Sequence, residues 1–161
     1  MWEPNEIRVL RWFMRFAGVG LILPGAIYTL SWPDTIHAFS LALGPGAATV
    51  AAGVTVAGSL AGGLTFLFAR YARPGAAVAV IALLLGSFVH LQWMRMMQDR
   101  LNDLPSALSD QQTAQLTDTI LFAANAQTPH ILKNLVLVGV CVVIFMLAPR
   151  LCGDHVEGQT A

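Results

Sequence analysis

Four long, mostly apolar stretches dominate the chain, with polar residues gathered between them and at the two ends. The stretches cover residues 9–32, 46–69, 75–97 and 130–149. A helix of about 20 apolar residues crosses the hydrocarbon core of a bilayer, which is about 30 Å thick. The pattern therefore predicts an all-α integral membrane protein, an antiparallel four-helix bundle that forms a single membrane domain over residues 1–161.

The connections between these stretches are short, except for a polar outer loop over residues 98–128. Within this loop Ser109 is followed three residues later by Gln112, which is the spacing of a capping box at a helix start. We expect a short extramembrane helix from about Asp110 to Ala124, lying against the mouth of the bundle.

A second short helix is predicted between the first two spans. Pro33 is expected to end the first span, because proline donates no backbone hydrogen bond. Residues 35–44 follow, with Ile36, Phe39 and Leu43 at helical spacing on one side. We expect this segment to lie in the membrane interface.

Composition indicates that lipid is the main solvent of the chain. The sequence is 56% hydrophobic and only 11% charged, whereas about a quarter of the residues in a soluble domain are charged. The formal net charge is zero, so no basic surface for a nucleic-acid partner is visible. The predicted partner is therefore the lipid bilayer.

Basic residues set the predicted orientation of the spans. The side that holds both termini carries six of them, and the opposite side carries three. The six are Arg8, Arg11, Arg15, Arg70, Arg73 and Arg150, and the three are Arg95, Arg100 and Lys133. Because segments rich in arginine and lysine stay in the cytoplasm, both termini are predicted to be cytoplasmic, including the tail at 150–161.

Small residues recur along the second span at the spacing of one helix face. Gly53, Ala57 and Ala61 form one row, and Gly58 and Gly62 form another. Small residues let the backbones of membrane helices approach closely. These rows predict either packing within the bundle or a docking face for another subunit.

Several short motifs resemble the DoxX family of small four-span membrane proteins. They are Arg11 and Gly25 in the first span, Pro33-Asp34 after it, Gly58, Gly62 and Gly63 in the second span, and Lys133-Asn134 followed by Gly139 in the last. The family often carries a lysine soon after the first-span glycine, and residues 26–31 contain none, so a role for that lysine does not transfer. The resemblance implies a bacterial cytoplasmic (inner) membrane, a redox neighbourhood and other membrane protein subunits as partners.

Polar side chains gather where the third and fourth spans are expected to meet at the outer side. His90 and Gln92 lie near the end of the third span, and His130, Lys133 and Asn134 open the fourth. Polar groups inside a membrane are costly and mark candidate sites. If the two spans are neighbours, these groups converge on a pocket that suits a quinone head or a lipid headgroup.

A purely structural role for the same residues stays open. Histidines at the interface can be wetted by headgroups, Lys133 can extend outward to the interface, and Asn134 can hydrogen-bond to another span. The cofactor is also open, although no two histidines show the i, i+4 spacing of metal ligands. A quinone therefore fits the pattern better than haem or a metal ion.

The sequence carries no phosphate loop, nucleophile elbow or zinc-binding helix, and Asp and Glu avoid the apolar cores of the spans. We expect an accessory subunit of a membrane-bound oxidoreductase complex, which packs against larger subunits and has no catalytic activity of its own. Two alternatives stay open, a stand-alone quinone-linked membrane oxidoreductase and a small-molecule membrane carrier.

Overall fold

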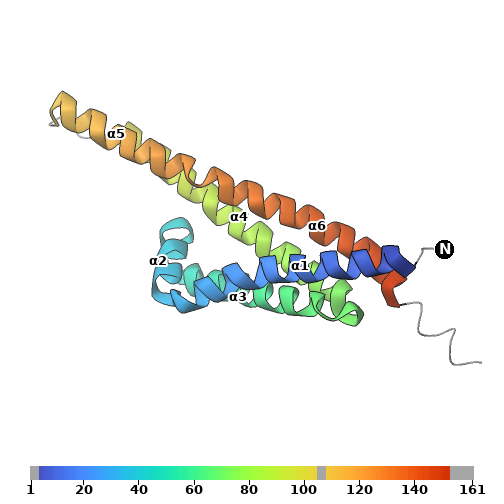
Figure 1. The fold of residues 1–161 in the computed structure, drawn as a ribbon. Coiled ribbons are helices and arrows are strands. Elements are labelled where there is room, and N and C mark those ends of the chain that lie inside the picture. The colour runs from blue at the N-terminus through green and yellow to red at the C-terminus, as the bar shows by residue number, and fades with distance from the viewer. Residues whose placement is uncertain (1–3, 105–107, 153–161) are drawn as a thin grey trace, which may run out of the picture.

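The computed structural model describes residues 4–104 and 108–152 of the 161-residue chain, and these form helices and no strands (Figure 1). The elements are α1 (Pro4–Leu30), α2 (Trp32–Leu43), α3 (Pro45–Phe66), the 3-10 helix η1 (Ala69–Tyr71), α4 (Ala72–Asn102), α5 (Asp110–Asn125) and α6 (Thr128–Cys152). Four stretches are long and apolar enough to cross a membrane, and the last of them combines α5 with α6. The predicted all-α membrane bundle is confirmed.

The long helices pack in the order α1, α3, α4 and α6, each chiefly against the next. Helices α1 and α6, at the two ends of this order, make few contacts with each other. Figure 1 shows them close together near η1 and apart near α2. The end of the bundle that holds η1, with Arg70 and Arg73, is called the basic end below.

Prolines fix where α2 and α3 begin. Helix α1 ends at Leu30, and Pro33 lies in the first turn of α2 rather than only stopping the helix before it. Proline suits a first turn because its missing N–H would find no helical partner there. Helix α2 therefore starts three residues before the predicted segment 35–44 and packs on α3 and α4.

Glycines bring α3 close to both of its neighbours. A Cβ added to Gly58 would come within 2.7 Å of the Ala82 side chain on α4, and one added to Gly62 within 2.7 Å of Ala79. On the α1 side, a Cβ on Gly63 would meet the carbonyl oxygen of Gly18 at 2.7 Å. The backbones therefore touch where these helices cross, and larger residues do not fit.

The predicted capping box of α5 is present. The Ser109 Oγ accepts a hydrogen bond from the Gln112 backbone N–H at 3.3 Å, and the Gln112 Oε1 accepts one from the Ser109 N–H at 3.1 Å. The helix spans Asp110–Asn125, close to the predicted Asp110–Ala124, but it does not lie across the bundle mouth. It packs along the far end of α4 and continues the line of α6 (Figure 1).

The apolar core fills the half of the bundle toward the basic end. Phe66, Met14 and Ile144 are its largest fully enclosed side chains, at 0–1% exposure. The rest of this cluster is Leu21, Ala72, Ala76, Ala79, Leu83, Cys141 and Ala148. The helices are therefore sealed together at this end, and a second buried cluster, Phe39, Ala48, Ala52 and Val89, packs α2 against α3 and α4 at the other end.

Candidate functional site

A cavity of about 160 Å³ lies between the helices on the α2 side of this core. Helices α1, α3, α4 and α6 form its walls. Thr35, Ala38 and Phe39 of α2 close it at the end opposite to the basic end. Leu21, Leu83 and Leu137 give it an apolar lining at the deep end. A cavity with apolar walls and a few polar groups is the usual form of a small-molecule site.

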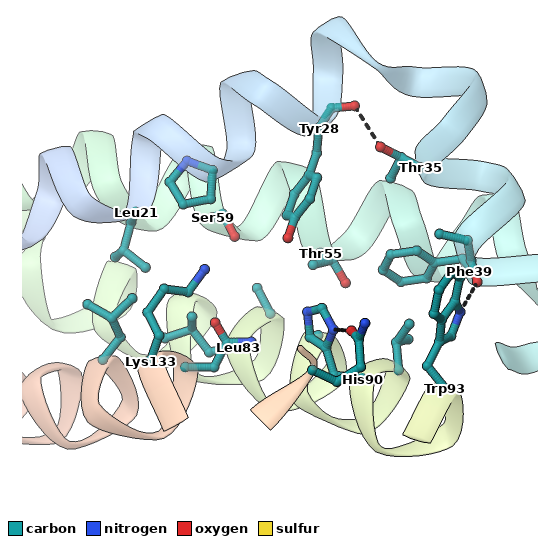
Figure 2. A pocket seen from close by; sticks show the side chains of 18 of the residues that line it. Leu21, Tyr28, Thr35, Phe39, Thr55, Ser59, Leu83, His90, Trp93 and Lys133 are labelled. Atoms are coloured by element: carbon teal, nitrogen blue, oxygen red, sulfur yellow. Dashed lines mark hydrogen bonds between the residues drawn. The ribbon is translucent and has the colours of Figure 1, made fainter. Parts of the chain in front are cut away.

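Two hydrogen bonds hold α2 over the cavity. The Thr35 hydroxyl donates to the carbonyl oxygen of Tyr28 at 3.0 Å, and the Trp93 indole N–H donates to the carbonyl oxygen of Ala38 at 2.9 Å. Figure 2 shows both pairs at the α2 side of the cavity. These bonds connect α2 to α1 and to α4, so α2 is held in place over the cavity.

His90 of α4 faces the cavity, and two contacts hold its ring. Its Nδ1 lies 2.7 Å from the Oε1 of Gln127, the residue just before α6. The His90 ring also stacks on the ring of His130, with centroids 5.0 Å apart and planes 9° from parallel. The ring orientation is therefore fixed by two contacts, and Figure 2 shows its second nitrogen turned toward the cavity.

Several polar side chains around the cavity, unlike His90, have no hydrogen-bond partner in the described chain. Thr55 is 5% exposed, and its Oγ1 is fully enclosed with no hydrogen bond. Ser59 and Asn134 are also buried, and no side-chain hydrogen bond joins either of them to another part of the described chain. Because buried polar groups are nearly always paired, these side chains mark the cavity as a candidate binding site.

Lys133 is the charged residue of the cavity lining. It does not extend outward to the interface, because Figure 2 shows its amino group directed across the cavity toward Ser59. No ion pair to Lys133 occurs within residues 4–104 and 108–152, and no carboxylate lines the cavity there. A cation without a counter-ion inside a membrane bundle is a functional candidate.

The structure brings together three of the five predicted ligand residues. His90, Lys133 and Asn134 line the cavity. His130 stacks behind His90, and Gln92 is not part of the lining. Asn134 makes no side-chain hydrogen bond to another span in the described chain, and its amide nitrogen faces Gly86 on α4.

The small-residue rows of α3 face two different ways. Gly58 and Gly62 pack against α4, as described above. Ala57 and Ala61 are exposed, and a Cβ added to Gly53 would meet nothing within 4 Å. Packing within the bundle therefore explains the first row, and a partner at the second row stays a prediction.

Sequence reasoning missed most of the side chains that line the cavity. Tyr28, Thr55 and Ser59 lie in apolar spans, and Gln127 falls in the predicted polar loop. The spacing of Thr55 and Ser59, four residues apart in a span of small apolar residues, is the signal that could have found them. Trp93, one residue after Gln92, also forms part of the cavity wall.

The cavity has room beside α1, between that helix and α6. Gly20 lines it, and a Cβ added there would meet no atom within 4 Å. Lys133, on the facing side, is exposed although its amino group points inward. Helices α1 and α6 make few contacts, so the seam between them beside the cavity is sparsely packed.

Among the described residues, no group of three or more His, Cys, Asp or Glu side chains is placed to hold a metal ion. Comparisons with protein-family models, curated proteins and solved structures find no match to this chain. The resemblance to the DoxX family accordingly stays a prediction.

Proposed function

We propose that this protein binds the head of a quinone-type amphiphile from the bilayer in the cavity beneath α2. The observation that carries the proposal is the convergence of unpaired polar groups on one cavity of a membrane bundle. Thr55, Ser59, Lys133 and Asn134 have no hydrogen-bond partner in the described chain, and all line the same space. A head with oxygen atoms would satisfy them, while its tail lies among apolar side chains.

The shape of the cavity supports a ligand that comes from lipid. The seam between α1 and α6 is sparsely packed, so a tail can leave the cavity sideways while the head stays inside. The core around Met14, Phe66 and Ile144 blocks the way to the basic end. A closed inner end favours binding over passage across the membrane, which weighs against the carrier alternative.

We place this binding activity in an accessory subunit of a bacterial inner-membrane oxidoreductase complex. The DoxX-like motifs support a redox setting, and the exposed face with Ala57 and Ala61 on α3 offers close contact to a larger subunit.

Binding is tested with the protein purified in a mild detergent and a short-tailed benzoquinone added. Quinones quench indole fluorescence at short range, and Trp93 forms part of the cavity wall. We expect saturable quenching that is largely lost in Trp93→Phe. Non-saturable quenching, equal in both proteins, would rule out a site in this cavity.

Gly20→Leu is the matched blocking variant. Its side chain would enter the cavity without a clash at Cβ, because no atom lies within 4 Å of that position. We expect folding to be retained and binding to be lost. Gly46→Leu is the control, since its Cβ position is equally open but Gly46 does not line the cavity.

A further inference from the structure

The hydrogen-bond pattern around Gln127 fixes which atoms of its amide face which neighbours. The Nε2 of Gln127 donates to the carbonyl oxygen of Ala123 at 3.3 Å, and the Oε1 lies 2.7 Å from the Nδ1 of His90. Rotating the amide by 180° would bring its oxygen against the Ala123 oxygen, leaving two acceptors face to face. The Oε1 therefore accepts, and the Nδ1 of His90 carries the hydrogen.

The second nitrogen of His90 is consequently an acceptor in the neutral ring, because neutral imidazole carries one N–H. This Nε2 has no hydrogen-bond partner among the described residues and is turned toward the cavity (Figure 2). The charged side chain of the lining is Lys133, and the ring behind His90 is His130. No carboxylate of the described chain stands there to balance a second proton on His90.

Two side chains of the lining, Lys133 and His90, thus offer one hydrogen-bonding sense each, while the Asn134 amide offers both a donor and an acceptor. The Lys133 ammonium can only donate, and the His90 Nε2 can only accept. The hydroxyls of Tyr28, Thr55 and Ser59 can do either, so they adapt to whatever is bound. A ligand that satisfies the whole cavity must offer an acceptor to Lys133 and an O–H or N–H donor to His90.

We propose that the cavity selects the reduced, hydroxyl-bearing form of its ligand, a quinol, over the quinone. This rests on the proposed function and names the redox state that the same site prefers. One quinol hydroxyl donates to the His90 Nε2, and the other quinol oxygen accepts from Lys133. A quinone has carbonyl oxygens only, so it would shield Nε2 from water without pairing it.

The test compares matched ligands on the wild-type protein in detergent, without oxygen. The dissociation constants of a short-tailed benzoquinol and of its benzoquinone are measured by calorimetry. We expect the quinol to bind about tenfold more tightly, the ratio that follows from one buried acceptor left unpaired. The dimethyl ether of the quinol, which keeps the ring but lacks both donors, should bind as weakly as the quinone.

Variants assign the preference to its atoms. His90→Leu removes the acceptor, and Gln127→Leu frees the ring to move its hydrogen to Nε2. We expect the quinol-to-quinone ratio to fall toward one in both. His37→Leu is the control, because His37 is exposed on α2 and does not line the cavity.

Equal affinity of wild type for the two forms, or tighter binding of the quinone, overturns the selectivity while leaving the proposed binding function standing. Binding of neither form overturns both. An unchanged ratio in His90→Leu would also refute the assignment. The wild-type comparison decides the question even if a variant fails to fold.

Discussion

At the scale of single residues, the cavity is distinguished by polar groups that lack hydrogen-bond or ion-pair partners. Thr55 has a fully enclosed hydroxyl without a partner, and Lys133 has a charge without a counter-ion in the described chain. The enclosed Thr55 hydroxyl costs free energy in the empty protein, since a buried unpaired polar group loses its water without replacement. A bound ligand would turn the same groups into its strongest contacts.

Replacing Lys133 by methionine tests the charged contact. Methionine keeps the length and the apolar stem but removes the ammonium, so quinol or quinone affinity should fall about 10- to 100-fold, the range for a hydrogen bond to a charged group. Titration calorimetry measures it. Gln92→Met is the matched control, because Gln92 does not line the cavity, and a comparable loss in that variant would contradict the assignment.

Thr55→Val should act in opposite directions on stability and on binding. Valine has the shape of threonine, so the empty protein gains about 1–3 kcal/mol once the unpaired hydroxyl is gone. Affinity for the ligand should fall, because a hydrogen bond is lost. Thermal unfolding in detergent, with and without ligand, separates the two effects.

The control for Thr55 is Thr49→Val, on the same helix at an exposed position. It should leave both unfolding temperature and affinity unchanged. If Thr55→Val lowered stability in the empty protein, the hydroxyl would have a partner there, and the hydroxyl would no longer point to a ligand.

At the scale of elements, the spacing of apolar residues predicted the helices well and their rotation poorly. The spans and the capping box at Ser109 follow from local sequence. The side of α3 that faces the cavity does not follow from local sequence, because small residues cover that helix on every side. Thr55 and Ser59 become visible as site residues only when Gly58 and Gly62 have fixed α3 against α4.

Gly62→Leu tests this contact between α3 and α4. The added side chain would have to displace the Ala79 side chain and the Gly75 carbonyl oxygen, which a Cβ alone would approach to 2.7 and 3.1 Å. We expect a loss of at least about 1–3 kcal/mol, the usual effect of overpacking, seen as a lower unfolding temperature in detergent.

Ala61→Leu provides the comparison one residue away. Ala61 is exposed, so a larger side chain there meets lipid or detergent instead of a helix. Its unfolding temperature should match that of the wild type. Similar destabilisation by both substitutions would mean that α3 is rotated differently from the arrangement described here. Loss of co-purifying protein in Ala61→Leu alone would identify a partner face.

At the scale of the whole molecule, the helix order α1, α3, α4 and α6 makes a bundle that is closed at the basic end and looser at the other. Sequence reasoning placed His90, Lys133 and Asn134 near one another because consecutive antiparallel helices bring similar depths together. It could not predict that Tyr28 lines the cavity or that α2 covers it. Both depend on how α1 and α3 pack against α4 and α6.

The basic residues predict that the two ends of the bundle face different compartments. In a Cys152→Ser background, Arg73→Cys should react with a membrane-impermeant maleimide only from the cytoplasmic side, and Asp118→Cys only from the other side. The reason is the excess of arginine near η1. The buried Cys141 should stay unlabelled in folded protein. Labelling of both engineered sites from one side would contradict the orientation.

The length of α4 has a practical consequence for the study of this protein. Its 31 residues span about 46 Å, which exceeds the hydrocarbon core of a bilayer by about 15 Å. We therefore expect the far end of α4 and the polar start of α5, which pack together, to stand clear of a detergent micelle as a paired rod. A chain of 161 residues gives electron-microscope images few landmarks of its own. An antibody fragment raised against this rod would supply one, and it would leave both the cavity and the seam between α1 and α6 uncovered.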